Sequence, residues 1–249
     1  LYSSMETCRL FRMKKKDYVI VFGVGSGLGA SLVRKFLSEG LQVLAVARKE
    51  TSLSNILADK KALNRLITST ADVTSSGDIN RIFLDATSTW GEPNVVIYNA
   101  GAFMKTSIID ATEKDFRKCW EANCLGGFLV GQKAAKLMVP KGSGTILFTG
   151  ATASKRGASQ FFNLSVGKAG LLMLAQSMAR ELSPKGIHIG HIIIDGQIRS
   201  SRYSQLESKR PPDGLIDPDA IADLYWQIYK QPRSAWTLET EIRPWVEKF

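Results

Sequence analysis

Two different hydrophobic periods alternate along this chain. Between segments of mixed polarity lie short apolar runs rich in β-branched residues, which predict buried strands at 18–22, 42–47, 65–70, 94–98, 144–149, 187–194 and 237–242. The segments between them carry apolar residues every three to four positions, the spacing of amphipathic helices. In the first such segment, Leu28, Leu32, Val33, Phe36 and Leu37 share one helical face. The chain is therefore expected to alternate strand and helix.

Capping and stop residues mark where several of these helices begin and end. Ser75 is an N-cap candidate, and Thr112 opens a capping box for a long helix that Pro140 ends. The pair at 217–218, Asp followed by Pro, predicts the start of a further helix. A weaker helical pattern covers 53–57.

Regular strand–helix alternation predicts the fold class: α/β, a three-layer, doubly wound parallel sheet of Rossmann-like type with helices on both faces. Residues 17–249 contain no linker-like composition, so we expect one domain there, preceded by a basic and disordered tail at 1–16. The segment 199–217 is rich in Ser, Arg and Pro and is expected to be a mobile loop over a substrate site.

Composition narrows the function classes. An apolar content of 44% and a charged content of 22% are those of a soluble globular protein, and no apolar run reaches the roughly 18 residues of a membrane span. Three cysteines are too few for a disulfide framework, which favours a reducing, cytoplasmic location. The basic start of the chain leaves organelle targeting as an alternative. The net charge of +10 is spread among acidic residues, and such a field suits a phosphorylated small molecule as well as nucleic acid. No basic run is interleaved with aromatic residues and no zinc or helix-turn-helix spacing is present, so nucleic acid is not the expected partner.

A glycine-rich turn follows the first predicted strand and opens the first predicted helix. In this context the turn lets backbone amides approach a pyrophosphate, and it assigns nucleotide-binding roles to Gly23, Gly25, Ser26, Gly27, Leu28 and Gly29. The second strand ends in Arg48-Lys49, whereas an acidic residue there would bind ribose hydroxyls. A guanidinium pairs instead with a 2′-phosphate, so these two residues indicate NADP rather than NAD.

The order and spacing of these motifs resemble the short-chain dehydrogenase/reductase family over about 18–243. Gly23-x-x-x-Gly27-x-Gly29 is similar to its cofactor glycines. The resemblance implies that Asp72 and Val73 contact the adenine, and that Asn99, Ala100 and Gly101 form a turn at the cofactor site. It also implies that Gly196, Ile198 and Ser200 contact the carboxamide of the nicotinamide, and that Asn123 belongs to a proton relay. Asp195 stands where the family usually has proline.

The active-site part of the resemblance is incomplete. The family places a tyrosine four residues before a lysine on one helix, and a serine thirteen residues before the tyrosine. Lys168 matches the lysine, which implies that it holds the nicotinamide ribose and, with Asn123, belongs to the catalytic site. However, Leu164 and Ala151 occupy the tyrosine and serine positions. Three further stretches resemble a subgroup of the family that often lacks the tyrosine: F-T-G-A-T-A-S, A-Q-S-M-A-R-E-L-S-P-K-G-I-H and Q-P-R-S-A-W-T.

Two hypotheses follow. The first is an NADP-dependent oxidoreductase that transfers hydride between nicotinamide and a carbonyl or alcohol substrate with altered acid–base residues. The second is a catalytically weak or inactive dinucleotide-binding pseudoenzyme that acts as a sensor or scaffold. Under the first hypothesis, the candidates for the missing proton donor are Thr149, Thr152, Ser154, Asn163, Ser165 and Tyr203.

Two further expectations concern the substrate and the assembly. Aromatic residues predict an apolar wall for the substrate pocket at Phe103, Phe161, Phe162 and Tyr203. The resemblance implies a homodimer or homotetramer built on the helix after Thr112 and the helix that contains Lys168. No metal site, nucleic-acid site or membrane association is expected.

Overall fold

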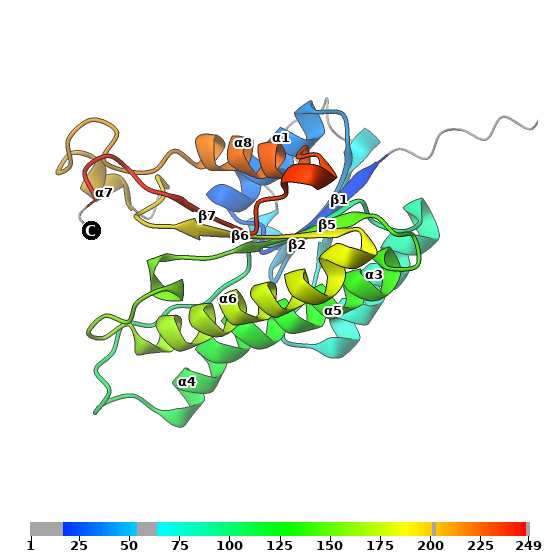
Figure 1. The fold of residues 1–249 in the computed structure, drawn as a ribbon. Helices are drawn as coiled ribbons and strands as arrows, with labels where there is room; N and C mark the ends of the chain where they lie inside the picture. Colours follow the sequence, from blue (N-terminus) through cyan, green and yellow to red (C-terminus); the bar gives the residue numbers. More distant parts are fainter. Residues whose placement is uncertain (1–16, 54–63, 201–202, 248–249) are drawn as a thin grey trace, which may run out of the picture.

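A computed structural model describes residues 17–53, 64–200 and 203–247. Its centre is a parallel sheet with strand order β3-β2-β1-β4-β5-β6-β7 (Figure 1). The strands are β1 (Tyr18–Phe22), β2 (Gln42–Ala47), β3 (Leu66–Thr70), β4 (Val95–Tyr98), β5 (Gly144–Thr149), β6 (Ile187–Ile194) and β7 (Glu239–Ile242). The helices are α1 (Leu28–Ser38), α3 (Ser76–Trp90), α4 (Glu113–Trp120), α5 (Gly126–Met138), α6 (Phe162–Leu182), α7 (Ser204–Glu207) and α8 (Pro218–Tyr229). All seven predicted strands are present within a residue or two of their expected bounds.

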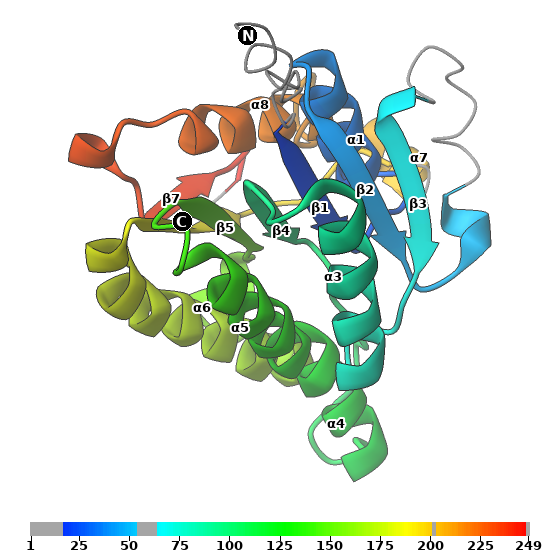
Figure 2. The ribbon, with the colours of Figure 1, turned by 90° about the vertical axis from the view of Figure 1, so that its right-hand side faces the viewer.

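Helices cover both faces of the sheet, which confirms the predicted three-layer architecture. In Figure 2, α1 and α8 lie on one face and α3, α5 and α6 on the other. Side chains of β1 alternate between two hydrophobic clusters: Val19 and Val21 belong to the cluster on the α1 and α8 face, and Ile20 and Phe22 to the cluster on the opposite face. Burial on both faces explains why the strands are continuous apolar runs.

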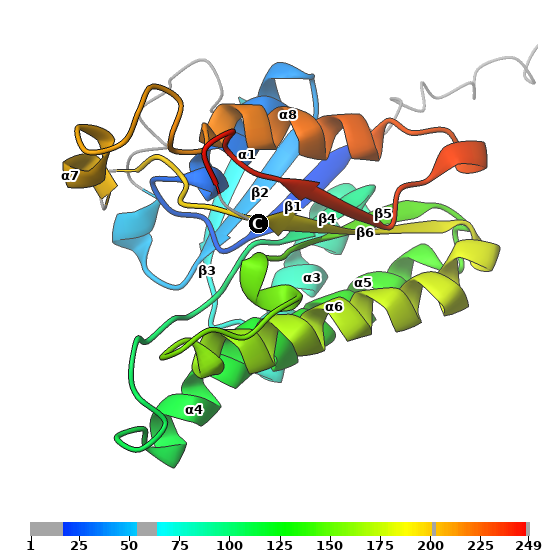
Figure 3. The ribbon, with the colours of Figure 1, turned by 60° about the vertical axis from the view of Figure 1, so that its left-hand side comes forward.

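The strand order reverses direction between β1 and β4. The connections after these two neighbouring strands go to opposite faces of the sheet, α1 to one and α4 and α5 to the other. Such a switch point opens a crevice at the carboxyl ends of the strands. Figure 3 shows the loops after β4, β5 and β6 gathered at this edge, together with α7.

The long helix predicted between Thr112 and Pro140 differs from the expectation in one detail. Helices α4 and α5 are joined without a break by a π-helical turn at Glu121–Leu125. A π-turn widens the backbone locally, which sequence periodicity does not reveal, and it is often found at functional sites.

Three other expectations fall partly or wholly on residues outside the described ranges. The tail at 1–16 lies outside them, as does most of the weak helix at 53–57, of which Leu53 is described and buried. Within 199–217, the described residues include the four-residue helix α7. Arg199 forms ion pairs there with Glu207 at 3.3 Å and with Asp217 at 3.5 Å.

Candidate active site

In the glycine turn after β1, two glycines are required because a side chain would not fit, and a third borders open space. Gly23 has φ +85°, and a Cβ on it would collide with the backbone of Ala100. A Cβ on Gly29 would lie 2.7 Å from Val24 Cα. At Gly25, by contrast, a Cβ would meet nothing within 4 Å, so packing within the protein does not require this glycine. The open space beside Gly25 and the amino end of α1 fit the pyrophosphate of a dinucleotide.

A cavity of about 720 Å³ runs along the carboxyl edge of the sheet from this turn. It brings together residues from four successive loops: Gly23 after β1, Arg48, Lys49 and Ser52 after β2, Asp72, Val73 and Thr74 after β3, and Asn99, Ala100 and Gly101 after β4. The sequence predicted nucleotide contacts for all of these except Ser52 and Thr74. Their common position follows from parallel strands, whose carboxyl ends share one edge.

The side chain of Asp72 in this cavity is held in place by Thr74, and its ionised form is favoured. Its Oδ1 accepts hydrogen bonds from the Thr74 hydroxyl at 2.7 Å and from the Thr74 amide at 2.9 Å. These bonds, and the positive charge of Arg48, lower the pKa of Asp72. Arg48 and Asp72 therefore lie near one another at the end of the cavity formed by β2 and β3.

Lys168 is only 6% exposed on α6. Its Nζ donates a hydrogen bond to the Thr149 carbonyl at the end of β5, at 2.6 Å. Burial lowers the pKa of Lys168 to about 8, because removal from water disfavours the charged form. The side chain thus crosses from α6 to the carboxyl edge of the sheet and carries an amine that titrates near neutral pH.

Asn123 lies in the π-helical turn and is fully buried. Its Nδ2 donates to the carbonyls of Ala102 at 2.6 Å and Cys119 at 2.8 Å, while its Oδ1 has no hydrogen-bond partner among the described residues. A Cβ on Gly101 would lie 2.8 Å from this Oδ1 and 3.7 Å from Lys168 Nζ. Glycine at 101 therefore lets the loop after β4 approach both side chains.

No hydroxyl stands at the two positions where the resemblance expects the catalytic serine and tyrosine. Ala151 is extended before a 3-10 turn (Thr152–Ser154), and Leu164 lies one helical turn before Lys168. Both residues are half-buried. A polar substitute for the proton donor would have to come from a neighbouring side chain.

Five of the six candidates for that role take part in hydrogen bonds, although the Ser154 hydroxyl does so as an acceptor. Thr149 Oγ1 contacts Tyr225 OH at 2.7 Å and donates to Asn99 Oδ1 at 3.1 Å. Three further contacts involve other side chains: Ser154 Oγ accepts the amide of Ala151, Ser165 donates to the carbonyl of Phe161, and Asn163 donates to the carbonyl of Met104. Thr152 donates to Asp195.

The remaining predicted cofactor residues line a second cavity of about 410 Å³. It joins the glycine turn (Ser26, Gly27 and Leu28) to the segment after β6 (Gly196, Ile198, Ser200 and Tyr203). A Cβ on Gly27 would lie 3.9 Å from Ser200 Cβ, so these segments are close neighbours. Both cavities therefore border the glycine turn, the first at Gly23 and the second at Ser26–Leu28.

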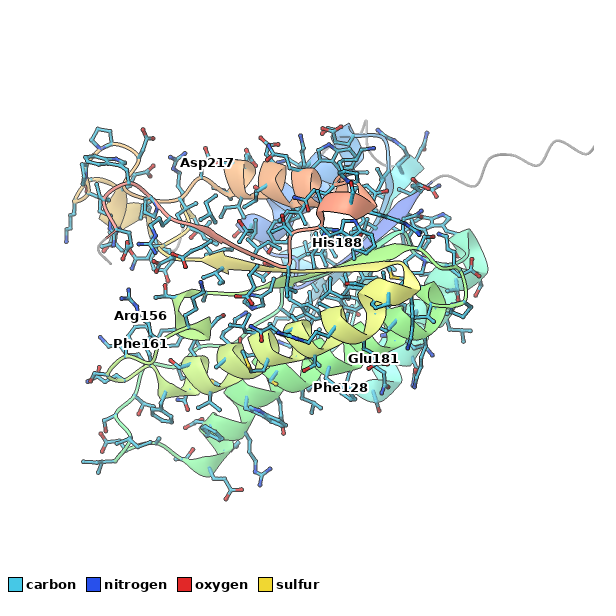
Figure 4. The ribbon with its side chains drawn as sticks, in the orientation of Figure 1. Phe128, Arg156, Phe161, Glu181, His188 and Asp217 are labelled. Atoms are coloured by element: carbon cyan, nitrogen blue, oxygen red, sulfur yellow. The ribbon has the colours of Figure 1, made fainter. Side chains whose placement is uncertain are left out.

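Three of the four predicted pocket-wall aromatics gather at one end of the helix layer. Phe103 stacks on Phe161 with ring centroids 4.8 Å apart, and Phe162 stacks on Phe116 at 6.3 Å. Figure 4 places Phe161 and Arg156 at the end of α6 that faces the carboxyl edge. Tyr203 belongs to the second cavity and is not part of this group.

Sequence reasoning assigned no role to a buried histidine in this region. His191 on β6 is 1% exposed, and neither ring nitrogen has a hydrogen-bond partner among the described residues. A Cβ on Gly150 would collide with its ring, so glycine precedes Ala151 to accommodate the imidazole. Burial, reinforced by the charges of Lys168 and Lys155, lowers the pKa of His191 to about 4. Side chains alternate along a strand, so His191 points to the same face of the sheet as Ile187 and Ile189, which pack on the α6 side. This alternation was the signal in the sequence that could have placed His191 there.

The described residues were compared with the requirements of a metal site and of a membrane-spanning helix. Within 17–53, 64–200 and 203–247, no group of three or more His, Cys, Asp or Glu side chains is placed to hold a metal ion. In the same ranges, no helix combines the length and apolarity needed to cross a membrane.

Comparison with known proteins gives a consistent set of matches. The family model for short chain dehydrogenases matches residues 17–209. The (21S)-21-acetoxyl-apo-melianone synthase SDR of Melia azedarach is 30% identical over 172 residues, which are 68% of this chain but only 63% of that protein, less than two thirds of its length. The crystal structure of a short-chain dehydrogenase from Rhodopseudomonas palustris is 40% identical, with a TM-score of 0.78 over 92% of this chain and 99% of that one.

A metagenomic short-chain oxidoreductase solved in complex with NADP shares the fold. It has a TM-score of 0.79 at 20% identity, over 93% of this chain and 98% of that one.

Proposed function

The chain belongs to the short-chain dehydrogenase family, and we propose that it is an NADP-dependent oxidoreductase acting on a carbonyl or alcohol substrate with altered acid–base residues. The observation that carries this proposal is the 720 Å³ cavity, which combines the glycine turn with Arg48, Lys49 and Ser52. The unfilled space at Gly25 fits a pyrophosphate. A relative of the same fold was solved with NADP.

The preference for NADP rests on the charge at the end of β2. Arg48 and Lys49 supply two positive charges, and Ser52 adds a hydroxyl at the same end of the cavity. A 2′-phosphate would gain charge-assisted hydrogen bonds from such residues, whereas the ribose hydroxyl of NAD would not.

The catalytic part of the proposal assigns roles to this chain's own residues. When bound, the nicotinamide supplies or accepts the hydride. Lys168 holds and orients the ribose side of the site and carries a proton at Nζ with a pKa of about 8. Asn123 fixes the loop after β4 through Ala102 and directs its free Oδ1 toward the space beside Gly101. Ala151 and Leu164 lack a hydroxyl, and we assign the role of the acid to the Lys168 ammonium, whose pKa of about 8 is lowered by burial.

Thermal unfolding and binding titrations with NADPH and NADH test this function. We expect NADPH to raise the unfolding midpoint in proportion to ln(1 + [L]/Kd), and NADH to raise it less. Arg48→Glu should weaken NADPH binding roughly tenfold or more, since it replaces a charge-assisted bond by repulsion, and should affect NADH less. Lys141→Glu, an exposed position before β5 at the opposite edge, is the matched control.

Three outcomes would count against the proposal. Absence of binding by both nucleotides would overturn the function, and equal weakening of both by Arg48→Glu would overturn the NADP assignment. NADPH binding without turnover on a panel of carbonyl and alcohol substrates would favour the dinucleotide-binding pseudoenzyme.

A further inference from the structure

Asp195 is a buried carboxylate between the turn after β5 and the segment that follows the last strand. It follows β6 directly, and only 4% of it is exposed. Burial of a carboxylate is unfavourable unless its oxygens are paired. Here Oδ1 accepts a hydrogen bond from the Thr152 hydroxyl, and Oδ2 lies 2.9 Å from Arg243 Nη2.

The backbone of Asp195 makes a third attachment. Its amide donates to the Ile242 carbonyl at 2.8 Å, which extends the pairing of β6 with β7 by one residue. The aspartate therefore attaches this segment to β7 through its backbone as well as through its carboxylate.

Arg243 connects Asp195 to a series of further ion pairs. Arg243 also pairs with Glu241 on β7, and Glu241 pairs with Lys155 at 3.4 Å. Lys155 immediately follows the 3-10 turn that contains Thr152. The turn after β5 is thus linked to β7 at two points, by Thr152 through Asp195 and Arg243, and by Lys155 through Glu241.

The segment after Asp195 also contacts Pro244 and Ile216. A Cβ on Gly196 would lie 2.8 Å from Pro244 Cδ, and the Gln197 carbonyl accepts the Ile216 amide at 2.9 Å. Asp195 stands at the inner end of this segment, where it is attached to the turn after β5. The turn after β5 and the Gly196–Ser200 segment, which lines the second cavity, are therefore joined through one carboxylate.

We propose that Asp195 is a positioning residue for the reaction: through Thr152 it fixes the turn that begins at Ala151 relative to the Gly196–Ser200 segment. This inference rests on the proposed function and on the expectation, implied by the family resemblance, that the Gly196–Ser200 segment contacts the carboxamide of the nicotinamide. Hydride transfer depends on the spacing of two reacting groups, and rigidly attached walls maintain it without reorganisation. The attachment matters more in a site without the tyrosine and serine hydroxyls, because fewer direct contacts orient the substrate oxygen.

The test compares two ligands in the full-length protein. NADPH reaches both ends of the site, whereas adenosine 2′,5′-bisphosphate reaches only the adenosine end. Thr152→Val, which removes the hydroxyl at nearly constant volume, should raise the Kd of NADPH about tenfold, the equivalent of one lost hydrogen bond. The Kd of the bisphosphate should not change. Asp195→Ala, which removes the acceptor of the Thr152 hydroxyl, should act in the same direction, and its thermal unfolding midpoint shows whether it folds.

Two controls separate positioning from general stability. Thr152→Ser keeps the hydroxyl and should retain the wild-type ratio of the two Kd values. Glu241→Gln breaks the outer pairs but keeps the bond from Thr152 to Asp195, and should also retain it. Equal weakening of both ligands by Thr152→Val, or no change in either, would overturn the inference. Failure of the unmodified protein to bind either ligand would instead overturn the proposed function.

Discussion

Leu164 and Lys168 are one helical turn apart on α6, and they differ in what they bring to the site. Lys168 keeps a buried amine bonded to Thr149, while Leu164 brings only a hydrocarbon side chain. Ala151 on the neighbouring turn likewise has no polar atom in its side chain. Under the proposed function, these three residues would leave the site with its nucleotide-binding lysine and without a hydroxyl at the two positions.

Restoring both hydroxyls measures what their absence means for turnover. Leu164→Tyr combined with Ala151→Ser should raise the rate of NADPH-dependent carbonyl reduction by about 10²-fold or more, the usual contribution of a general acid. The rate is measured by loss of NADPH absorbance over a panel of carbonyl compounds. Adding Lys168→Met to the double variant should remove the gain, because the new phenol would lose its neighbouring charge. An unchanged rate with intact NADPH binding would show that pocket shape, and not the missing acid, limits the reaction.

His191 makes stability depend on pH. Its folded pKa of about 4 lies below its ordinary value near 6.5, so the unfolded chain binds the proton more readily than the folded one. The free energy of unfolding therefore falls as pH decreases from about 6.5 toward 4, and above 6.5 this contribution is constant. Lys168 and Lys155, whose charges act on the imidazole, strengthen the effect.

Substitution of His191 should abolish that part of the acid sensitivity. Between pH 7 and pH 5, wild-type protein should lose about 2 kcal/mol of unfolding free energy more than His191→Leu, as measured by urea denaturation at each pH. His188→Leu is the comparison variant: burial lowers the pKa of His188 as well, but its Nε2 contacts the Thr237 carbonyl at 2.9 Å, which opposes the shift, so this substitution should change the pH dependence in the same direction and by less. Identical pH dependence of wild type and His191→Leu would contradict the assignment of a neutral buried imidazole.

At the scale of elements, side-chain caps start the helices where local sequence places them. Ser75 accepts the Asp78 amide at 3.2 Å, and Thr112 accepts the Asp115 amide at 3.1 Å. Each cap satisfies one of the amides that a helix leaves unpaired at its first turn. These contacts are local in sequence, which is why composition and spacing alone located them.

Removal of one cap should destabilise the protein by a modest amount. Ser75→Ala is expected to lower the unfolding free energy by about 1 kcal/mol, since the Asp78 amide loses its acceptor. Chemical denaturation monitored by circular dichroism measures the change. Ser88→Ala on the same helix removes an exposed hydroxyl that bonds only the Leu84 carbonyl, and should change stability by less than half as much. Equal effects of the two substitutions would exclude a specific capping role for Ser75.

The π-helical turn between α4 and α5 is an element that local sequence did not indicate. It contains Asn123, whose amide bonds Cys119 within the helical run and Ala102 outside it. The turn also lies against α6, where a Cβ on Gly167 would be 2.6 Å from Asn123 Cβ. The widened backbone and the close approach of α6 depend on each other, so neither can be inferred from one helix alone.

At the scale of the whole molecule, helices α5 and α6 leave an apolar surface exposed. Phe128 on α5 is 40% exposed, and Val166 and Met173 on α6 are 45% and 52% exposed. Figure 4 marks Phe128 on this helix layer. The homodimer or homotetramer expected from the family resemblance remains a prediction, and this surface is where the resemblance places its interface.

A charge on this surface should weaken self-association. Met173→Glu is expected to shift the protein toward a monomer, because a carboxylate in an apolar interface loses its hydration. Light scattering after gel filtration gives the mass of each species. Leu84→Glu changes a residue that is 66% exposed on α3 and should leave the mass unchanged. A monomeric wild-type protein, or a Met173→Glu variant of unchanged oligomeric mass, would contradict the expected assembly.

The sequence by itself determined the strands, the capped helix starts and the order of the nucleotide-binding loops. These features depend on local interactions: periodicity sets which faces are buried, and caps and glycines act within a few residues of their position. The alternation of strand and helix then fixed the layered parallel fold, because parallel strands require crossovers. For the same reason, the sequence alone assigns Arg48, Asp72, Asn99 and the glycine turn to one edge of the sheet.

Only the tertiary structure decided which distant side chains meet at that edge. Thr152 and Asp195 are 43 residues apart, and Thr149 and Tyr225 are 76 residues apart. Their contacts depend on how β5, β6 and the helices pack, which no local pattern encodes. Burial also changed the acid–base chemistry: the pKa values of Lys168 and His191 are lowered because packing removes both side chains from water. The sequence specifies the ordinary pKa of a residue but not how far the fold buries it.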